Sequence, residues 1–278
     1  MNTATRRVWK VGRLILLAYG VVLVLLFSFQ RTLMYPGRMT QGDPRAVVSE
    51  RAGLELIDLG DAVAAFLPAD RADAPTLIMF YGNGDSLKNF LPFGEGMRDR
   101  GMNVAVMEYP GYGMSSGSMS EANAFGAASQ LYTLVASREG VDPNKIVALG
   151  VSLGGGSAVH VAEKHPVAGL VTMSTFTSMR SMAVRAIKII PPILVLDDYD
   201  NLARLPDIEV PMYIVHGTDD ELIPYSMSLD LADAAGGVVT HVPIDGAGHN
   251  DLFQVGGAAM WDDIADWCHS VTADTGEQ

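Results

Sequence analysis

Ser152 is the residue whose surroundings most clearly predict chemistry in this sequence. It lies in a Gly-x-Ser-x-Gly pattern between Gly150 and Gly154, after an apolar β-branched segment and before a small-residue helical pattern. A strand–turn–helix arrangement of this kind holds one hydroxyl in a strained turn, and glycine lets the strand and the helix approach closely. The N-terminal amides of the helix would also favour an anion that forms at this hydroxyl. We therefore predict that Ser152 is a nucleophile.

The same Gly-x-Ser-x-Gly pattern occurs a second time, at residues 113–117, and is centred on Ser115. This copy follows a stretch rich in turn-forming residues, and a helix-like pattern resumes only near Ser120. The strand–turn–helix context that the chemistry requires is therefore missing, and we expect Ser115 to lie in a polar loop.

A serine nucleophile needs a histidine to remove its proton, and the histidine needs a carboxylate to fix its tautomer. His249 lies in a glycine-rich loop directly after an expected strand at residues 238–243. A loop at the carboxyl end of a strand is where a parallel sheet places its chemistry, so His249 is the expected base. The other histidines lie in expected strands or helices, where packing or a surface position is the simpler interpretation: His160, His165, His216, His241 and His269.

The acid is expected in the loop that follows the preceding strand, at residues 212–216. Three carboxylates stand there side by side: Asp219, Asp220 and Glu221. Two of them have a simpler interpretation as solvated or capping residues before a helical pattern at residues 226–235. The residue pattern alone leaves the choice among the three open.

These segments, in this chain order, resemble the α/β-hydrolase superfamily, in which the nucleophile, the acid and the base follow one another in the same way. The similar segments span roughly residues 75 to 255: 81–83, 108–113, 150–155, 175–178, 219–220 and 246–252. The chain resembles in particular a membrane-anchored branch with a small cap, which includes protein depalmitoylases, lysophospholipid lipases and uncharacterised bacterial esterase-like proteins.

The resemblance implies roles for individual residues. Asp220 matches the acid of the family signature H-G-x-x-D-x-x-[VI]-P, with Asp219 as the alternative. The N–H groups of Asn83 and Leu153 are implied as the oxyanion hole. Tyr81 stands where the family usually has a histidine that shapes this loop, so the geometry of the oxyanion hole is an open question.

The expected activity is hydrolysis of a carboxylic ester or thioester, with an acyl or lipid-like substrate and an acyl-enzyme on Ser152. No metal or organic cofactor is implied. Two alternatives stay open: an amide hydrolase similar to serine aminopeptidases, and a non-catalytic scaffold of this fold that acts as a binding module. The sequence does not indicate an oligomeric state.

The order of the expected elements predicts an α/β fold with a mainly parallel central sheet and helices on both faces. An antiparallel hairpin at residues 54–67 is expected at one edge of this sheet. At 278 residues and 49% hydrophobic content, the chain can bury one sizeable core. The strands are expected at 76–80, 102–108, 146–150, 167–173, 212–216 and 238–243, and the helices at 87–100, 120–139, 153–165, 226–235 and 257–270.

The N-terminal region predicts a single transmembrane helix. Residues 14–29 are uncharged and almost wholly apolar, four basic residues precede them, and Arg31 follows. A cleaved signal peptide is the alternative, but no suitable cleavage site follows the apolar run. The excess of basic residues on the amino side places the amino terminus in the cytoplasm and the catalytic domain outside it, in a bacterial periplasm.

We therefore expect a membrane anchor at residues 1–36 and a hydrolase domain at residues 37–278, with a cap-like insert at about 174–211. Because every catalytic motif follows residue 75, a fragment that begins near Arg38 is expected to be soluble and active. Within the insert, the apolar run at residues 187–196 has three open interpretations. It could pack on the sheet as a helix and turn, form a wall for an acyl chain, or dip into the bilayer.

The charge of the chain argues against a nucleic-acid partner. The net charge is −13, and the residues after Arg31 include 14 basic against 32 acidic side chains, a net charge of −18. Such an acidic surface repels a phosphate backbone. The single cysteine, Cys268, excludes an intramolecular disulfide and a cysteine-based metal site.

Overall fold

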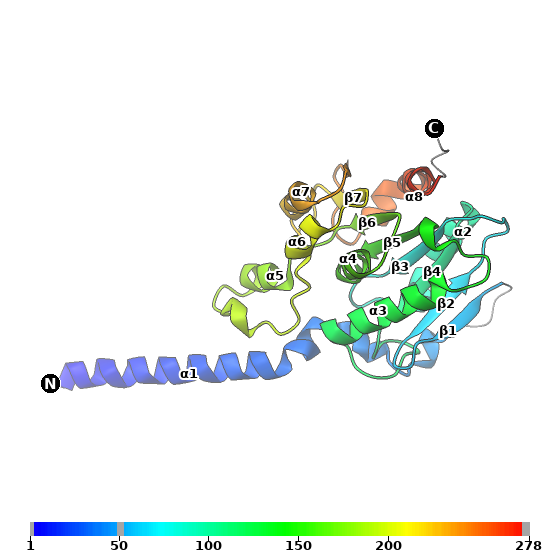
Figure 1. The fold of residues 1–278 in the computed structure, drawn as a ribbon. Helices are drawn as coiled ribbons and strands as arrows, with labels where there is room; N and C mark the ends of the chain where they lie inside the picture. The colour runs from blue at the N-terminus through cyan, green and yellow to red at the C-terminus, as the bar shows by residue number, and fades with distance from the viewer. Residues whose placement is uncertain (1–2, 49–52, 274–278) are drawn as a thin grey trace.

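The computed structural model describes residues 3–48 and 53–273, so the last five residues of the expected hydrolase domain lie outside the described part. The described strands are β1 (Glu55–Asp58), β2 (Val63–Leu67), β3 (Thr76–Phe80), β4 (Asn103–Glu108), β5 (Ile146–Val151), β6 (Gly169–Met173), β7 (Met212–Gly217) and β8 (Val239–Ile244). They form one sheet in the order β1-β2-β4-β3-β5-β6-β7-β8 (Figure 1). Strands β3 to β8 are parallel, and β2 is antiparallel to both of its neighbours. The expected sheet and its edge hairpin are confirmed.

Helices cover both faces of this sheet: α1 (Thr3–Met34), α2 (Leu87–Asp99), α3 (Glu121–Ala136), α4 (Gly154–Lys164), α5 (Met179–Ala186), α6 (Asn201–Arg204), α7 (Tyr225–Ala234) and α8 (Leu252–Val271). Helices α3 and α4 pack on one face, and α2 and α8 on the other (Figure 1). Every residue of β3, β4 and β6 is buried. Because these strands are covered on both sides, their sequences are continuously apolar rather than alternating.

Helix α8 differs from its expected start. The sequence pattern predicts a helix from residue 257, whereas α8 begins at Leu252 and contains a kink at Gly257, where φ is 57°. A positive φ suits glycine, so this residue permits the kink that the periodicity alone treats as a helix start. The first turn of α8 therefore lies close to the loop that contains His249.

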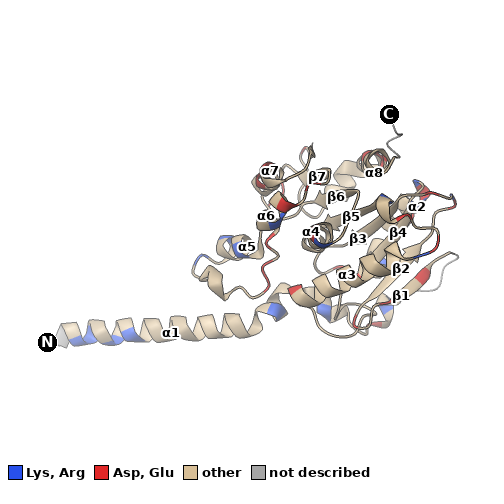
Figure 2. Ribbon diagram, in the orientation of Figure 1, with Lys and Arg blue, Asp and Glu red and all other residues tan. Residues whose placement is uncertain are grey.

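Helix α1 extends well away from the rest of the molecule (Figure 1). It is the one helix in the described part of the chain that is long and apolar enough to cross a membrane. Its 32 residues correspond to about 48 Å at 1.5 Å per residue, more than the hydrocarbon thickness of about 30 Å. The Lys and Arg residues of α1 gather mainly at its amino-terminal end (Figure 2).

The carboxyl end of α1 is packed on the hydrolase body across the expected domain boundary at residue 36. Arg31 forms a two-point ion pair with the buried Asp197, at 2.8 and 2.9 Å. The Tyr35 side chain is 1% exposed, and its Oη donates to the same carboxylate at 3.0 Å. Gly37 lies so close to the Tyr112 ring that a Cβ would be 2.0 Å from it. Structural contacts therefore continue from the body into the last turn of α1.

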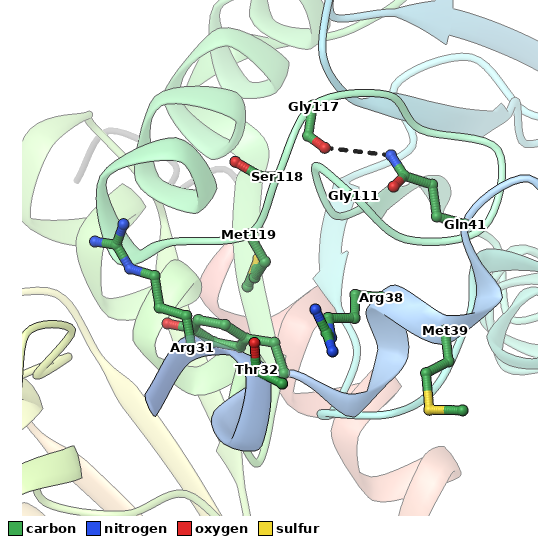
Figure 3. A pocket seen from close by; sticks show the side chains of 10 residues that line it. Arg31, Thr32, Arg38, Met39, Gln41, Gly111, Gly117, Ser118 and Met119 are labelled. Atoms are coloured by element: carbon green, nitrogen blue, oxygen red, sulfur yellow. Dashed lines mark hydrogen bonds between the residues drawn. The ribbon is translucent and has the colours of Figure 1, made fainter. Parts of the chain in front are cut away.

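The chain beyond α1 also borders a pocket of about 350 Å³ (Figure 3). The side chain of Gln41 donates to the carbonyl oxygen of Gly117 at 3.2 Å and joins this segment to the body. The side chains of Arg31 and Arg38 point apart in this pocket, and Arg31 turns towards its ion pair.

The insert between β6 and β7 contains α5 and then the apolar run at residues 187–196. This run does not pack on the sheet as a helix: Ile189 is 57% exposed and Ile193 is 84% exposed. It lies beside α1 instead. The Tyr19 hydroxyl donates to the Ile189 carbonyl oxygen at 2.7 Å, and the Gln30 amide donates to the Leu194 carbonyl oxygen at 3.0 Å.

Candidate active site

Ser152 occupies the sharp turn between β5 and α4, and its φ of 52° lies in the left-handed region. Its N–H donates to the carbonyl oxygen of Met173 at 2.8 Å, which holds the turn against β6. A Cβ on Gly150 would lie 2.3 Å from the Gly154 carbonyl oxygen, and one on Gly154 would lie 2.1 Å from the Phe80 carbonyl oxygen. Both glycines are therefore required by the close crossing of strand and helix.

Three side chains from three different loops form one hydrogen-bonded chain. Ser152 Oγ is 3.1 Å from His249 Nε2, and His249 Nδ1 is 2.8 Å from Asp220 Oδ2. Because a carboxylate only accepts, Nδ1 carries the hydrogen, and Nε2 of the neutral ring is free to accept from the serine hydroxyl. The loops follow β5, β7 and β8, whose carboxyl ends meet at one edge of the sheet.

Among the three adjacent carboxylates, it is Asp220 that bonds to His249. The Asp219 carboxylate accepts a long contact from the Thr218 hydroxyl at 3.5 Å, and Glu221 is exposed. The structure therefore places Asp220, the residue implied by the resemblance, next to the candidate base.

The Asp220 carboxylate is fully buried yet held in its ionised form. Its Oδ1 accepts the N–H groups of Leu222 and Ile223 at 3.0 and 2.7 Å. Burial raises its pKa, but the hydrogen bonds from His216, His249 and Ile223 outweigh burial and hold the pKa well below its usual range. A carboxylate that stays ionised can keep the His249 ring in one tautomer and stabilise its protonated form.

His216 takes part in this site, although the sequence interpretation gave it only a place at the end of a strand. Its ring is fully buried, and Nε2 lies 2.9 Å from the Ile223 carbonyl oxygen and 3.4 Å from Asp220 Oδ2. Both neighbours are acceptors, so Nε2 carries a hydrogen and ties the strand to the acid loop. The available signal was its first place in the H-G-x-x-D signature.

The other histidines and the second serine motif have partners that explain them structurally. Ser115 is 3% exposed, donates to the Glu108 carbonyl oxygen at 3.1 Å and accepts the Val63 N–H at 3.0 Å. His160 stacks on Phe125 with ring centroids 4.2 Å apart. The remaining three contact other side chains or the backbone: His165 stacks on Tyr132, His241 bonds to Ser228, and His269 bonds to the Arg100 carbonyl oxygen.

The loop after β3 lies directly beside the nucleophile, since a Cβ on Gly82 would be 3.4 Å from the Ser152 Cβ. No hydrogen bond among the described residues uses the N–H of Asn83 or of Leu153. The Asn83 side chain is fixed from two sides: its Nδ2 donates to the Met34 carbonyl oxygen, and its Oδ1 accepts from the Tyr112 hydroxyl. The last residue of α1 therefore helps to hold the loop of the candidate oxyanion hole.

Tyr81 shapes this loop through a buried pair with Glu108. Its hydroxyl donates to Glu108 Oε1, which also accepts the Leu87 N–H at 2.9 Å. The Tyr109 hydroxyl in turn donates to the Tyr81 carbonyl oxygen at 3.0 Å. Burial raises the pKa values of both Tyr81 and Glu108. A tyrosine–carboxylate pair thus stabilises the turn that the expected histidine would otherwise stabilise.

A pocket of about 390 Å³ opens in front of Ser152 and His249. One side of it is polar and contains Asn83, while the other is formed by apolar side chains from α2, α8 and the acid loop: Phe90, Phe93, Leu222, Leu252 and Phe253. Such walls suit an apolar group attached to a polar reacting centre. Within the part of the chain that the structure describes, no group of three His, Cys, Asp or Glu side chains could hold a metal ion.

A family model described as the alpha/beta hydrolase fold matches residues 75–191. An esterase of Pyrococcus furiosus shares the fold, with a TM-score of 0.66 at 14% identity, over 81% of this chain and 97% of that chain. Together with the strand order and the turn at Ser152, these matches show that the chain belongs to the α/β-hydrolase superfamily.

Two relatives illustrate its similarity to other sequences. An uncharacterized protein of Mycobacterium tuberculosis is 26% identical over 255 residues, which is 90% of each chain. Alpha/beta hydrolase domain-containing protein 17B of Homo sapiens is 30% identical over 178 residues, which is 64% of this chain and 61% of that protein.

Proposed function

We propose that the protein is a serine hydrolase that cleaves a carboxylic ester or thioester through an acyl-enzyme intermediate. The observation that supports this proposal is the hydrogen-bonded chain from Ser152 through His249 to Asp220, with distances of 3.1 and 2.8 Å. A fold alone does not define an activity, so the proposal depends on this arrangement.

In the first half-reaction, Ser152 Oγ attacks the carbonyl carbon of the substrate while its proton passes to His249 Nε2. The oxygen that becomes negative accepts hydrogen bonds from the N–H groups of Asn83 and Leu153. The bond from carbon to the leaving oxygen or sulfur then breaks, and His249 gives its proton to the alcohol or thiol. Asp220 holds the ring and stabilises its positive charge throughout.

In the second half-reaction, His249 removes a proton from water, and the resulting hydroxide attacks the acyl carbon. The acyl–Ser152 bond breaks as the oxyanion collapses, and the proton returns to Ser152 Oγ. The products are a carboxylic acid and the free enzyme. The apolar side of the pocket supports an acyl or lipid-like substrate, and the acidic body supports the absence of a nucleic-acid partner.

The membrane-anchored, small-cap branch of the superfamily is the closest match in organisation. We propose that α1 is an uncleaved anchor, with its basic amino-terminal end in the cytoplasm and the hydrolase body outside. A C-terminal alkaline phosphatase fusion should then be active in bacteria, and the full-length chain should stay in the membrane fraction. An inactive phosphatase fusion, or a shortened soluble protein, would overturn this topology.

The test of the proposed activity compares Ser152→Ala with Ser115→Ala in the hydrolysis of p-nitrophenyl butyrate. Loss of the nucleophile should lower kcat/KM by about 10⁴ or more while the fold is retained. Ser115→Ala should stay active, because the structure gives this hydroxyl only backbone partners among the described residues. Full activity in Ser152→Ala would overturn the proposal.

A further inference from the structure

Two apolar helix faces line a groove beside the catalytic pocket. One belongs to the last third of α1, where the lining positions recur at a spacing of three or four residues: Leu23, Leu26, Phe27, Gln30, Leu33 and Met34. The other belongs to α5 and follows the same spacing: Met179, Met182, Ala183 and Ala186. This spacing places each set on one side of its helix, so the two apolar stripes face each other. In Figure 1, α5 lies beside the carboxyl-terminal part of α1.

The two stripes do not close on one another. A space of about 410 Å³ separates them, although apolar helix faces in a protein interior normally interdigitate without such voids. Polar contacts join the two sides around the space. The Tyr19 hydroxyl bonds to the Ile189 carbonyl oxygen, the Gln30 side chain bonds to the backbone of Leu194, and Arg31 pairs with Asp197.

The groove lies along the candidate membrane helix. From Leu23 to Met34 the wall extends for about 16 Å at 1.5 Å per residue, close to one leaflet of a hydrocarbon layer about 30 Å thick. The turn after α5 adds Ile189 and Ile193, which are 57% and 84% exposed, on the same side of the molecule. These exposed apolar side chains match an environment of lipid tails rather than water.

The groove continues to the catalytic pocket through Leu222, which lines both cavities. The N–H of Leu222 donates to Asp220 at 3.0 Å, so this side chain sits on the acid loop itself. Met34 at the other wall of the groove holds the Asn83 side chain through its carbonyl oxygen. Both ends of the catalytic pocket are thus attached to walls of the groove.

We propose that this groove binds the long acyl chain of a lipid resident in the bilayer and guides its ester carbonyl to Ser152. The inference rests on the proposed ester or thioester hydrolysis and names its substrate class. An acyl chain fits the length of the wall and its apolar lining, and it enters from the leaflet without crossing water. The membrane helix is therefore a wall of the substrate site as well as an anchor.

The first test uses the unmodified full-length chain in phosphatidylcholine vesicles that contain a phosphatidylcholine with a diazirine near the end of one acyl chain. Illumination should attach this lipid to Met182 or Ala183 on the groove side of α5, as located by mass spectrometry. Labelling confined to α1 residues on its freely exposed side, such as Ile15 or Leu16, would overturn the proposal.

The second test narrows the groove. Ala183→Trp places an indole in the space, while Val184→Trp is the matched control, because Val184 is 40% exposed and lies outside the groove lining. We expect Ala183→Trp to lower the ratio of kcat/KM for long-chain over short-chain p-nitrophenyl esters by more than about tenfold, since even one lost methylene contact in an apolar pocket has an effect of this size. The control should keep the wild-type ratio.

Equal ratios in Ala183→Trp and the wild type would overturn the groove as an acyl site. The two proposals fail in different ways. If the wild type hydrolyses no ester of either length, the proposed function fails, and photolabelling of α5 still decides whether the groove binds an acyl chain. If α5 is not labelled while short-chain esters are hydrolysed, the groove proposal fails alone.

Discussion

The replacement Asp220→Asn tests the proposed triad at a single atom, because it leaves the size of the side chain almost unchanged. The two oxygens of Asp220 have different partners. Oδ1 accepts the N–H groups of Leu222 and Ile223 at 3.0 and 2.7 Å, while Oδ2 accepts the His249 Nδ1–H at 2.8 Å. An amide has one acceptor oxygen and one donor group, so it can satisfy only one of these two sides.

The amide oxygen should stay on the loop side, because the reverse orientation would set the NH₂ group against two N–H donors, at about 1–3 kcal/mol for each lost bond. The NH₂ group then faces His249 Nδ1 and stabilises the tautomer with hydrogen on Nε2. That tautomer cannot take the proton from Ser152 across the 3.1 Å contact. We expect kcat/KM to fall by about 10⁴, or about 5 kcal/mol of transition-state stabilisation.

The assay is p-nitrophenyl butyrate hydrolysis by the full-length chain in detergent micelles, with the melting temperature as the control for folding. Asp219→Asn is the matched variant, because its carboxylate has no bond to His249 among the described residues. It should stay close to wild type. The reasoning is refuted if Asp220→Asn keeps more than about a tenth of wild-type kcat/KM, where tautomer control predicts about 10⁴, or if both variants lose activity equally.

Three further predictions concern the surroundings of the site. Tyr81→Phe deprives the buried Glu108 of a donor, so the free energy of unfolding should fall by about 1–3 kcal/mol, which calorimetry would detect as a lower Tm; an unchanged Tm would contradict the role of this pair. Burial raises the pKa of Glu108 in the folded chain, so its ionisation opposes folding above its unfolded pKa of about 4.3. The stability of the wild type relative to Glu108→Gln, measured by urea unfolding, should therefore decrease from about pH 3 to about pH 7, and an increase would show that the sign is wrong. A fragment that begins at Arg38 lacks the buried Tyr35 and the carbonyl of Met34, so it should melt at a lower temperature and hydrolyse the ester more slowly than the full chain; equal behaviour would show that the junction is dispensable.

The sequence carries enough information to predict the sheet and the three loops of the candidate triad. The strands at the centre are continuously apolar because both their faces are covered, and this pattern survives in the sequence without further context. The turn at Ser152 is equally visible, since Gly150 and Gly154 are dictated by local crossing of backbone segments. The choice among adjacent carboxylates depended on the resemblance, because all three share the same loop.

The contacts between distant segments could not be predicted in the same way. The pair of Tyr81 with Glu108 joins residues 27 positions apart, and neither residue type announces a partner. The bond from Asn83 to Met34 links the catalytic loop to the anchor, which sequence periodicity treats as a separate element. This separation produced the expectation of an independent fragment beginning near Arg38, whereas the structure buries Tyr35 against the body. The groove between α1 and α5 depends on the same long-range packing.

The most direct test of the central claim is the identity of the residue that a fluorophosphonate probe modifies in the full-length protein. The probe bonds covalently to an activated serine oxygen, and mass spectrometry of the digested protein locates the adduct. We predict a single adduct on Ser152, absent from Ser152→Ala and formed more slowly in His249→Ala. An adduct on Ser115, or no adduct on the folded wild-type chain, would contradict the account.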